Sequence, residues 1–397
     1  MTKEFTNIAA FAQAHRDEDP VRLLLQQDRH PGVDMRLVAQ QLEGLAQAPA
    51  KWPSWSACPE VCYPPKLNRE QSSSEVAARY KASLLRGDEA EGVDLTGGMG
   101  VDTYFMALRT GRMHYCEQDP NLCQLATHNF AALGQTNILV HEGDSMEWLR
   151  ATDGRVFPYI YIDPARRDSY GSRTTAFESC TPNLMKWLPL LRSRCERLLV
   201  KASPMLDLHL AMAQLGEVAE VHIVAVAGEC KEMLLASGSG ETQIVCVNLR
   251  PTGRDEHRFT LAEEQAAPYR AAPCVQRYLY EPHAALMKGG CYRLLAQWYD
   301  LGALDTHSHL YTAEHLREDF PGRILEVECT TRLDRKVLRQ LLPEGKAHVI
   351  CRNYPARADR LQQQLGLTEG GDHYLVATTC AGQRTGLLCR LVRSAVR

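Results

Sequence analysis

The sequence predicts an α/β protein with a doubly wound, seven-stranded core, a helical N-terminal extension and a smaller α/β module at the C-terminus. At 397 residues the chain is longer than one ordinary hydrophobic core requires, which favours two or three domains. From Gly92 onward, apolar runs alternate with helical patterns, as in βαβ units around a mostly parallel sheet. A polar, proline-containing segment after Arg250 then precedes a second α/β region.

The N-terminal extension has apolar residues at helical spacing, as in MRLVAQQL from Met35. A loop rich in Pro and Trp is expected from Ala48 to Pro65. The segment QSSSEVAARYKASLL then predicts a helix, because Ser72 and Glu75 have the spacing of a capping box. The apolar face of this helix is expected to hold Val76, Tyr80 and Leu84.

The predicted core alternates short apolar strands with helices. Strands are expected near residues 92–96, 113–117, 137–140, 157–162, 196–201, 218–226 and 243–249. Helices are expected near residues 100–109, 120–132, 182–193 and 206–214. In such a sheet, ligands bind at the carboxyl ends of the strands.

The polar segment after Arg250 is interpreted as an inter-domain link. Two helices are expected after it, near residues 282–287 and 292–301. The last part of the chain predicts, in order, strand ILEVECT, helix DRKVLRQLL, strand AHVICR, helix RADRLQQQL and strands YLVATT and GLLCRLV.

Composition excludes several classes of protein. The chain is 45% hydrophobic and 23% charged, and no stretch approaches the roughly 18 uncharged apolar residues of a membrane span. The N-terminus has no basic-then-apolar signal pattern, so a cytoplasmic location is expected. The 14 cysteines are scattered singly apart from Cys58 and Cys62, so reduced thiols and no metal site are expected.

Charge is unevenly distributed along the chain. The net charge is -3, yet residues 321–397 hold 13 Lys and Arg against 7 Asp and Glu, a net +6. The basic C-terminal region indicates contact with a polyanion, and a solvated basic face is the alternative.

A glycine-rich turn follows the first predicted strand, in the sequence VDLTGGMGVD from Val93 to Asp102. Glycine lets the backbone turn tightly and approach a ligand, and the following helix directs its first amides toward that ligand. A dinucleotide site is one alternative, but the third glycine of its fingerprint is missing. The other alternative is that these glycines only form a turn and bind no ligand. The candidate cofactor residues in this segment are Asp94, Thr96, Gly97, Gly98, Gly100 and Asp102.

An acidic residue lies at or just after the end of each of the first three predicted strands. Asp94 is placed to meet an ammonium group directly or through the turn. Glu117, followed by Gln118, is placed to accept hydrogen bonds from two ribose hydroxyls. Asp144, followed by Ser145, is placed to accept from an adenine amino group. The series predicts a nucleoside-containing cofactor that carries an amino acid.

These motifs resemble those of class I methyltransferases that use S-adenosylmethionine (SAM). DLTGGMGVD is similar to their motif I, Glu117 and Asp144 occupy the second and third motifs, and DPAR at residues 163–166 is similar to motif IV. The resemblance implies a Rossmann-like methyltransferase core with SAM as the cofactor. It also implies that the methyl acceptor lies beside the DPAR segment.

The DPAR segment supplies the predicted catalytic residues, which are Asp163, Pro164, Ala165 and Arg166. Related enzymes that methylate exocyclic amines have a second proline and an aromatic residue where this chain has Ala165 and Arg166. An arginine stacks on bases or grips phosphates, and Arg167, Tyr170 and Arg173 follow closely, which favours a nucleic-acid acceptor. The alternative is an Asp-Pro turn with surface arginines.

Four further polar residues near later strand ends are second-rank candidates, with buried ion pairing or helix capping as the alternative. They are Lys201 and Ser203 in VKASPML and Glu229 and Lys231 in AGECKEMLL.

The C-terminal region resembles the THUMP-like domain of a group of bacterial methyltransferases, and the segment before it resembles their ferredoxin-like domain. The resemblance implies a helical region at 1–88, a methyltransferase core at 89–250, a linker and ferredoxin-like segment at 251–322, and a THUMP-like domain at 323–397. THUMP domains commonly dock RNA, which implies tRNA or rRNA as the partner. The expected RNA contacts are Arg332, Arg335, Lys336 and Arg352 in this region, with Arg167 beside the DPAR segment.

The expected function is therefore SAM-dependent methylation of an RNA base, with no membrane or metal partner. Two alternatives remain open. One is a small-molecule methyltransferase whose C-terminal region is only structural. The other is a catalytically silent RNA-binding protein that senses SAM.

Overall fold

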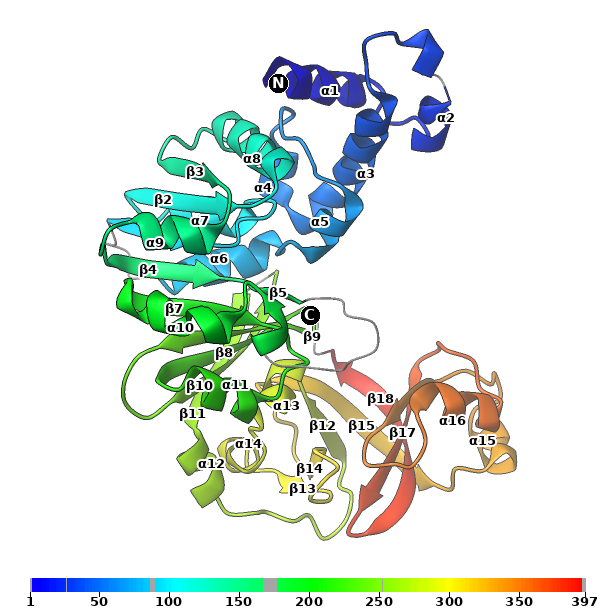
Figure 1. Ribbon diagram of the computed structural model, residues 1–397. Coiled ribbons are helices and arrows are strands. Elements are labelled where there is room, and N and C mark those ends of the chain that lie inside the picture. Colours follow the sequence, from blue (N-terminus) through cyan, green and yellow to red (C-terminus); the bar gives the residue numbers. More distant parts are fainter. Residues whose placement is uncertain (1, 26, 86–89, 167–176, 252, 395–397) are drawn as a thin grey trace. The chain divides into compact units, whose positions relative to one another are not determined.

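The computed structural model describes residues 2–25, 27–85, 90–166, 177–251 and 253–394 (Figure 1). It divides into two compact units. The first comprises Met1–Val218 and Leu234–Gly238, and the second comprises Ala219–Met233 and Ser239–Arg397. No helix in the described ranges is long and apolar enough to cross a membrane.

The first unit is built around five parallel strands in the order β7-β4-β1-β2-β3. Their bounds are β1 (Glu91–Asp94), β2 (Arg112–Glu117), β3 (Ile138–Glu142), β4 (Phe157–Ile162) and β7 (Cys195–Ala202). The chain moves outward from β1 to β3 and then returns to β4 on the other side of β1. The carboxyl ends of β1 and β4 therefore form the switch point at which such sheets bind ligands.

Helices alternate with these strands, as the sequence predicts (Figure 1). They are α7 (Val101–Ala107), α8 (Pro120–Ala132), α9 (Ser145–Ala151), α10 (Leu184–Ser193) and α11 (Leu208–Leu215). The short strands β5 (Ala165–Arg166) and β6 (Cys180–Thr181) form a separate antiparallel pair, and the 3-10 turn η2 (Phe177–Ser179) precedes β6. The fold thus places the DPAR segment directly after β4.

The N-terminal helices precede this sheet in the chain. They are α1 (Thr2–Ala14), α2 (Pro20–Leu24), α3 (Met35–Lys51), α4 (Pro53–Ser56), α5 (Lys66–Gln71) and α6 (Glu75–Ser83), with the 3-10 turn η1 (Gln27–Arg29). Helix α3 continues through Pro49, so the loop expected from Ala48 begins too early. Trp52 and Trp55 are fully buried in this segment, which explains how apolar packing maintains helical turns despite the prolines.

The predicted capping box at Ser72 and Glu75 is wrong. Ser72 ends α5, and Glu75 is the first residue of α6. The Glu75 carboxylate instead accepts hydrogen bonds from the backbone N and the Oγ of Ser54, both at 2.8 Å. Val76 is exposed whereas Tyr80 is buried, so the predicted apolar face is also only partly correct. A long-range partner has displaced the local capping interaction.

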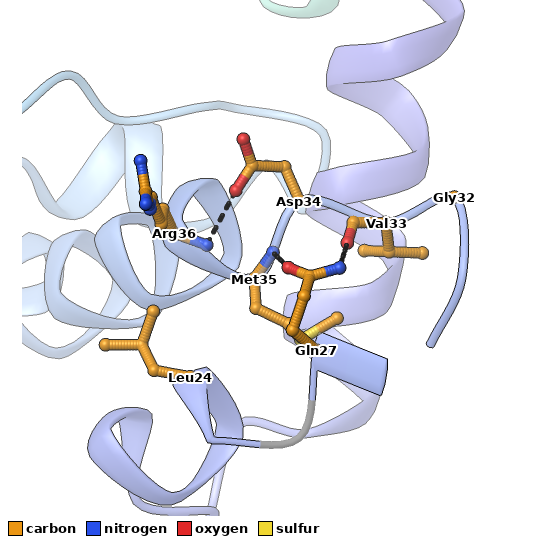
Figure 2. A pocket seen from close by; sticks show the side chains of 7 residues that line it. All are labelled: Leu24, Gln27, Gly32, Val33, Asp34, Met35 and Arg36. Carbon is orange, nitrogen blue, oxygen red and sulfur yellow. Dashed lines mark hydrogen bonds between the residues drawn. The ribbon is translucent and has the colours of Figure 1, made fainter. Parts of the chain in front are cut away.

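A hollow of about 550 Å³ lies among the N-terminal helices (Figure 2). Gln27 spans part of it: its Nε2 donates to Val33 O at 2.8 Å and its Oε1 accepts from Met35 N at 3.0 Å. The lining residues are Leu24, Gln27, Gly32, Val33, Asp34, Met35 and Arg36. None of these is a predicted cofactor or acceptor residue.

The second unit contains β8 (Val218–Val226), β10 (Gln243–Arg250) and β11 (Gly253–Thr260). Strand β10 is parallel to β8 and antiparallel to β11. Strand β9 (Glu229–Ser237) supplies residues to both units. The sequence predicts β8 and β10 but not β9 or β11. The segment interpreted as a link forms β11 and helix α12 (Leu261–Ala266), so that interpretation is wrong.

The rest of the second unit is a seven-stranded sheet with the order β13-β14-β12-β15-β18-β17-β16. Its strands are β12 (Tyr278–Pro282), β13 (Gly302–Ala303), β14 (Tyr311–Ala313), β15 (Gly322–Thr331), β16 (His348–Cys351), β17 (His373–Cys380) and β18 (Gln383–Arg393). Its helices are α13 (Ala284–Gly289), α14 (Arg293–Trp298), α15 (Arg335–Leu341) and α16 (Ala358–Leu365). One core cluster joins residues from both halves of this sheet, including Leu279, Leu304, Leu325, Val376 and Leu387.

A buried histidine makes the second unit sensitive to acid. His283 is 2% exposed and caps α13 by accepting a hydrogen bond from Leu286 N at its Nδ1. Burial, with the nearby charges of His257 and Arg250, lowers the pKa of His283 to about 3. Below about pH 6.5 the imidazole of residue 283 becomes protonated in the unfolded chain, whereas in the native protein it stays neutral. The stability that depends on the neutral imidazole is therefore full above about pH 6.5 and falls as the pH drops toward 3.

Hydrogen exchange of the Ala284–Gly289 segment tests this prediction. After correction for intrinsic rates, protection should fall between about pH 7 and about pH 5 in the native protein. The His283→Asn variant keeps a capping oxygen but does not titrate, so its protection should change less. Identical pH dependence in the two proteins would show that His283 is not responsible.

Candidate cofactor and acceptor site

The turn after β1 is tied to helix α7 by Asp94. This residue is 1% exposed, and its carboxylate accepts from Thr96 N at 3.0 Å and from Thr103 Oγ1 at 2.6 Å. Burial raises the pKa of Asp94 to about 7, against the hydrogen bonds from Thr103 and Thr96 and with the added repulsion of Asp102 and Asp163. Of the two roles predicted for Asp94, this geometry favours the one that acts through the turn.

The three glycines of the turn have different tasks. A Cβ on Gly97 would lie 2.2 Å from Tyr115 Cε2, and one on Gly100 would lie 2.7 Å from Phe130 Cζ. These two glycines are thus needed by the packing beneath the turn. Gly98 has a φ of +53° and faces open space, since the nearest atom to its Cβ position is Thr96 O at 3.9 Å. Gly98 is the glycine whose missing side chain leaves the turn accessible.

Glu117 connects the end of β2 to the same turn. Its Oε2 accepts from Gly98 N at 2.8 Å, and its Oε1 accepts from Gln118 N at 2.7 Å and from Asp119 N at 3.0 Å. The carboxylate thereby fixes the turn between β1 and α7. Its predicted contact with ribose hydroxyls stays a prediction.

Asp144 begins helix α9 after β3. Its Oδ1 accepts from Met146 N at 2.8 Å and Glu147 N at 3.1 Å, and Ser145 beside it is 4% exposed. Gly143 N donates to Glu117 O at 2.9 Å, which joins the ends of β2 and β3. The structure therefore brings together the strand-end acids that the sequence predicts as a group.

Asp102 is held by protein side chains on several elements. It lies 3.0 Å from Lys81 Nζ on α6, and its Oδ2 accepts from Ser73 Oγ at 2.8 Å and from Tyr161 OH at 3.0 Å. Burial by itself raises the pKa of Asp102, but Lys81 and Lys201, with hydrogen bonds from Lys81 and Ser73, bring it below the usual value. Asp102 thus anchors α7 to α6 and β4, and its cofactor contact stays a prediction.

Asp163 follows β4 at the switch point. Its backbone N donates to Thr96 Oγ1 at 2.7 Å, and its Oδ2 accepts from Lys201 Nζ at 2.5 Å. Pro164 is buried and Ala165 is exposed. Arg166 lies in β5, and Arg167, Tyr170 and Arg173 lie outside the described residues. The acceptor segment is therefore joined to the predicted cofactor turn through Thr96.

Lys201 is the second-rank candidate that the structure brings to Asp163. In the parallel pairing of β4 and β7, Ile162 lies opposite Val200. The residues that come next, Asp163 and Lys201, therefore lie beside each other. Glu229 pairs with Lys231 at 2.5 Å on exposed surface, and Ser203 Oγ accepts from Met205 N at 3.2 Å. The sequence feature that made Lys201 a candidate was its charge at the end of a predicted strand, which in the structure is the neighbour of β4.

The predicted RNA contacts in the second unit divide into two groups. Arg332, Arg335 and Lys336 are exposed around the start of α15. Arg352 instead forms an ion pair with Glu281 at 2.8 Å, and Arg323 pairs with the same carboxylate at 2.8 Å. The pair with Glu281 engages the Nε and one Nη of the Arg352 guanidinium.

In the described ranges, no group of three His, Cys, Asp or Glu side chains is arranged to hold a metal ion. All 14 cysteines are free thiols.

Comparison with known proteins places this architecture in a class. Residues 278–321 match the model of a ferredoxin-like domain, and residues 322–391 match the model of a THUMP-like domain. A crystal structure from Porphyromonas gingivalis W83, of a protein assigned as a methyltransferase, is 32% identical. It covers 98% of this chain and 99% of its own, with a TM-score of 0.87. The chain therefore belongs to this methyltransferase family, with ferredoxin-like and THUMP-like domains at the C-terminus.

More distant structures match only part of the chain. An rRNA methylase from Streptococcus thermophilus is 16% identical over 40% of this chain and 92% of its own, with a TM-score of 0.30. TrmK from M. capricolum, in complex with S-adenosylhomocysteine (SAH), is 11% identical over 41% of this chain and 67% of its own, with a TM-score of 0.32. A search of curated proteins gave no significant match.

Proposed function

We propose that this protein is a SAM-dependent methyltransferase that modifies a base in tRNA or rRNA, with the THUMP-like domain as the RNA-docking module. The observation that carries the proposal is the Thr96 link between Asp94 and Asp163. Thr96 N donates to the Asp94 carboxylate, and Thr96 Oγ1 accepts from Asp163 N. One residue therefore joins the predicted cofactor turn to the predicted acceptor segment.

The residues present fit SAM. Gly98 leaves the turn open, and Glu117 and Asp144 supply acceptor oxygens at adjacent strand ends. Because its pKa is about 7, the buried Asp94 carboxyl group is partly ionised near neutral pH. A bound cation would favour its ionised form. When bound, SAM supplies a methyl group on a sulfonium, which is already an activated donor.

The chain's own task is then positioning. Asp163, 34% exposed at its side chain, can accept a hydrogen bond from the N–H or O–H of an acceptor and orient its lone pair. Ala165 and Arg166 stand where related enzymes carry a second proline and an aromatic residue. Exposed Arg332, Arg335 and Lys336 are available to phosphates, which supports an RNA partner.

A small-molecule methyltransferase is the second candidate, and the Arg352–Glu281 pair favours it. That pair occupies one of the predicted phosphate contacts. An RNA methyltransferase should bind RNA at low salt, whereas a small-molecule methyltransferase should not.

Mass spectrometry of nucleosides from total RNA tests the proposal. One methylated nucleoside should be absent from a deletion strain and present in the wild type and in the complemented strain. Total RNA from the deletion strain should also accept labelled methyl groups from SAM when the purified protein is added. An unchanged nucleoside profile together with no transfer to this RNA would contradict the RNA substrate.

The binding of SAM should weaken in acid because of Asp94. Its pKa is raised from 3.8 to about 7, so in the native protein it holds a proton that the unfolded chain releases. The native-state stability that this proton contributes is full below pH 3.8 and is lost as the pH rises through about 7. A bound cation nearby instead favours the ionised form, so SAM affinity should fall as the pH drops below about 7.

Calorimetric titration with SAM between about pH 5 and about pH 8 measures this dependence. The Asp94→Asn variant keeps an acceptor oxygen and a side chain of the same shape, but it does not titrate. Its SAM affinity should therefore change less with pH. A flat profile for the native protein would rule out Asp94 as the responsible group.

A further inference from the structure

A fully buried lysine lies beside the predicted cofactor turn. Lys81, on α6, is 0% exposed, although lysine side chains are almost never fully buried unless they are paired. Its Nζ lies 3.0 Å from Asp102 Oδ1 and donates to Ser73 Oγ at 2.6 Å. Taking two charges out of water is costly, and an apolar pair of similar size is often at least as stable. Stability alone therefore does not explain a lysine at this position.

The partner of Lys81 belongs to the first turn of α7. Asp102 is the second residue of this helix, two positions after Gly100, the last glycine of the cofactor turn. Its Oδ2 accepts from Ser73 Oγ at 2.8 Å and from Tyr161 OH at 3.0 Å. Side chains from three segments thus hold one carboxylate: Ser73 before α6, Lys81 on α6 and Tyr161 on β4.

The next residue joins the same turn of α7 to β1. Thr103 Oγ1 donates to Asp94 Oδ2 at 2.6 Å, and both side chains are buried. Adjacent residues of a helix point about 100° apart, so Asp102 and Thr103 together fix the rotation of α7 about its axis as well as its position. These two contacts therefore orient the first amides of α7 and the glycine turn that precedes them.

We propose that Lys81 is a positioning residue of the cofactor site, which holds the first turn of α7 in place for SAM through Asp102. This inference rests on the proposed function. Without Lys81, the Asp102 carboxylate would be buried with its charge uncompensated, so it would turn toward water. The first turn of α7 would move with it, and the glycine turn would leave the position that SAM requires.

Calorimetric titration of a Lys81→Met variant with SAM tests this role without any RNA substrate. Methionine keeps an unbranched apolar side chain but carries no charge. At a temperature at which the variant is folded by circular dichroism, its dissociation constant should rise by about tenfold or more, with one site per chain retained. A merely structural role would lower the fraction of folded chains and leave the dissociation constant of the folded ones unchanged, which would overturn the proposal.

Arg69→Met is the matched control. Arg69 is 3% exposed and pairs with Glu43 at 2.6 Å, and neither residue belongs to the predicted cofactor site. This variant also removes a buried cation from its carboxylate, so it should lose thermal stability as Lys81→Met does. Its dissociation constant for SAM should stay within about threefold of the native value. Equal weakening of SAM binding in the two variants would contradict a specific role for Lys81.

The double variant Lys81→Met/Asp102→Asn tests whether Lys81 acts through Asp102. It leaves no buried charge without its partner, so it should fold even if Lys81→Met alone does not. Asp102→Asn should bind SAM more weakly than the native protein, and the double variant should bind it no more weakly than Asp102→Asn. Native affinity in Asp102→Asn, or a further loss in the double variant, would refute the coupling.

Tyr161→Phe tests the same contact with a smaller change. It keeps the ring and removes the hydroxyl that donates to Asp102, so SAM binding should weaken by about threefold to tenfold. Tyr280→Phe loses a hydroxyl that donates to His315 O at 3.1 Å in the second unit, and it should bind SAM as the native protein does. Native affinity in Tyr161→Phe would show that the position of Asp102 does not matter for SAM.

The proposed function and the role of Lys81 fail in different ways. If the native protein binds no SAM, the proposed function fails. If the native protein binds SAM and Lys81→Met binds it equally well, only the role of Lys81 fails.

Discussion

A Gly98→Val variant is expected to lose about a hundredfold or more in SAM affinity. Its φ of +53° disfavours a β-branched side chain, which costs about 1–2 kcal/mol of stability. The larger effect is steric, because the new methyl groups would occupy the open space above the turn. Calorimetric titration with SAM measures the loss directly.

Gly134→Val is the matched control for this variant. Gly134 has a φ of +74° with nothing within 4 Å of its Cβ position, and it lies outside the predicted site. Both variants should lose similar thermal stability, whereas only Gly98→Val should lose SAM binding. Equal SAM affinity in the two variants would show that the turn is not the cofactor site.

An Asp163→Ala variant is expected to lose about a hundredfold or more in methyl transfer to RNA. Its SAM affinity should stay within about threefold of the native value. The side chain removed is predicted to contact the acceptor, while the hydrogen bond from the backbone of residue 163 to Thr96 remains available. Labelled transfer to deletion-strain RNA gives the rate, and calorimetry gives the affinity.

Asp153→Asn serves as the control for this second variant. Asp153 is exposed and precedes β4, whereas Asp163 follows it at the opposite end of the strand. Transfer should be unchanged in Asp153→Asn. A loss of SAM affinity in Asp163→Ala as large as in Gly98→Val would contradict the separation of cofactor turn and acceptor segment.

The buried parallel strands could be predicted because they are continuous apolar runs bounded by turn residues. The strand expected near 157–162 coincides with β4, whose residues are almost all buried. Strands β9 and β11 were missed for a physical reason. Strand β11 is paired on one side only, and an edge strand tolerates the polar sequence GRDEHRFT. Strand β9 begins with the charged sequence ECKE, which hides its apolar second half.

The candidate site was predictable where position along a strand determines position in space. Glu117 ends β2 and Asp163 follows β4, on the two sides of β1, so their placement at the same edge of the sheet follows from the topology. The side-chain partners of Asp102 were not predictable in this way. Ser73, between α5 and α6, and Lys81, on α6, precede it by 29 and 21 positions, and their approach to Asp102 depends on tertiary packing. The same holds for Glu281, which meets Arg352 across 71 positions.

We predict that the turn from Asp94 to Asp102 binds SAM. Calorimetric titration of the purified, full-length protein with SAM, and separately with SAH, tests it most directly. Saturable binding of both ligands at one site per chain is expected, and it should be lost in Gly98→Val and retained in Gly134→Val. No binding of either ligand by the native protein would contradict it.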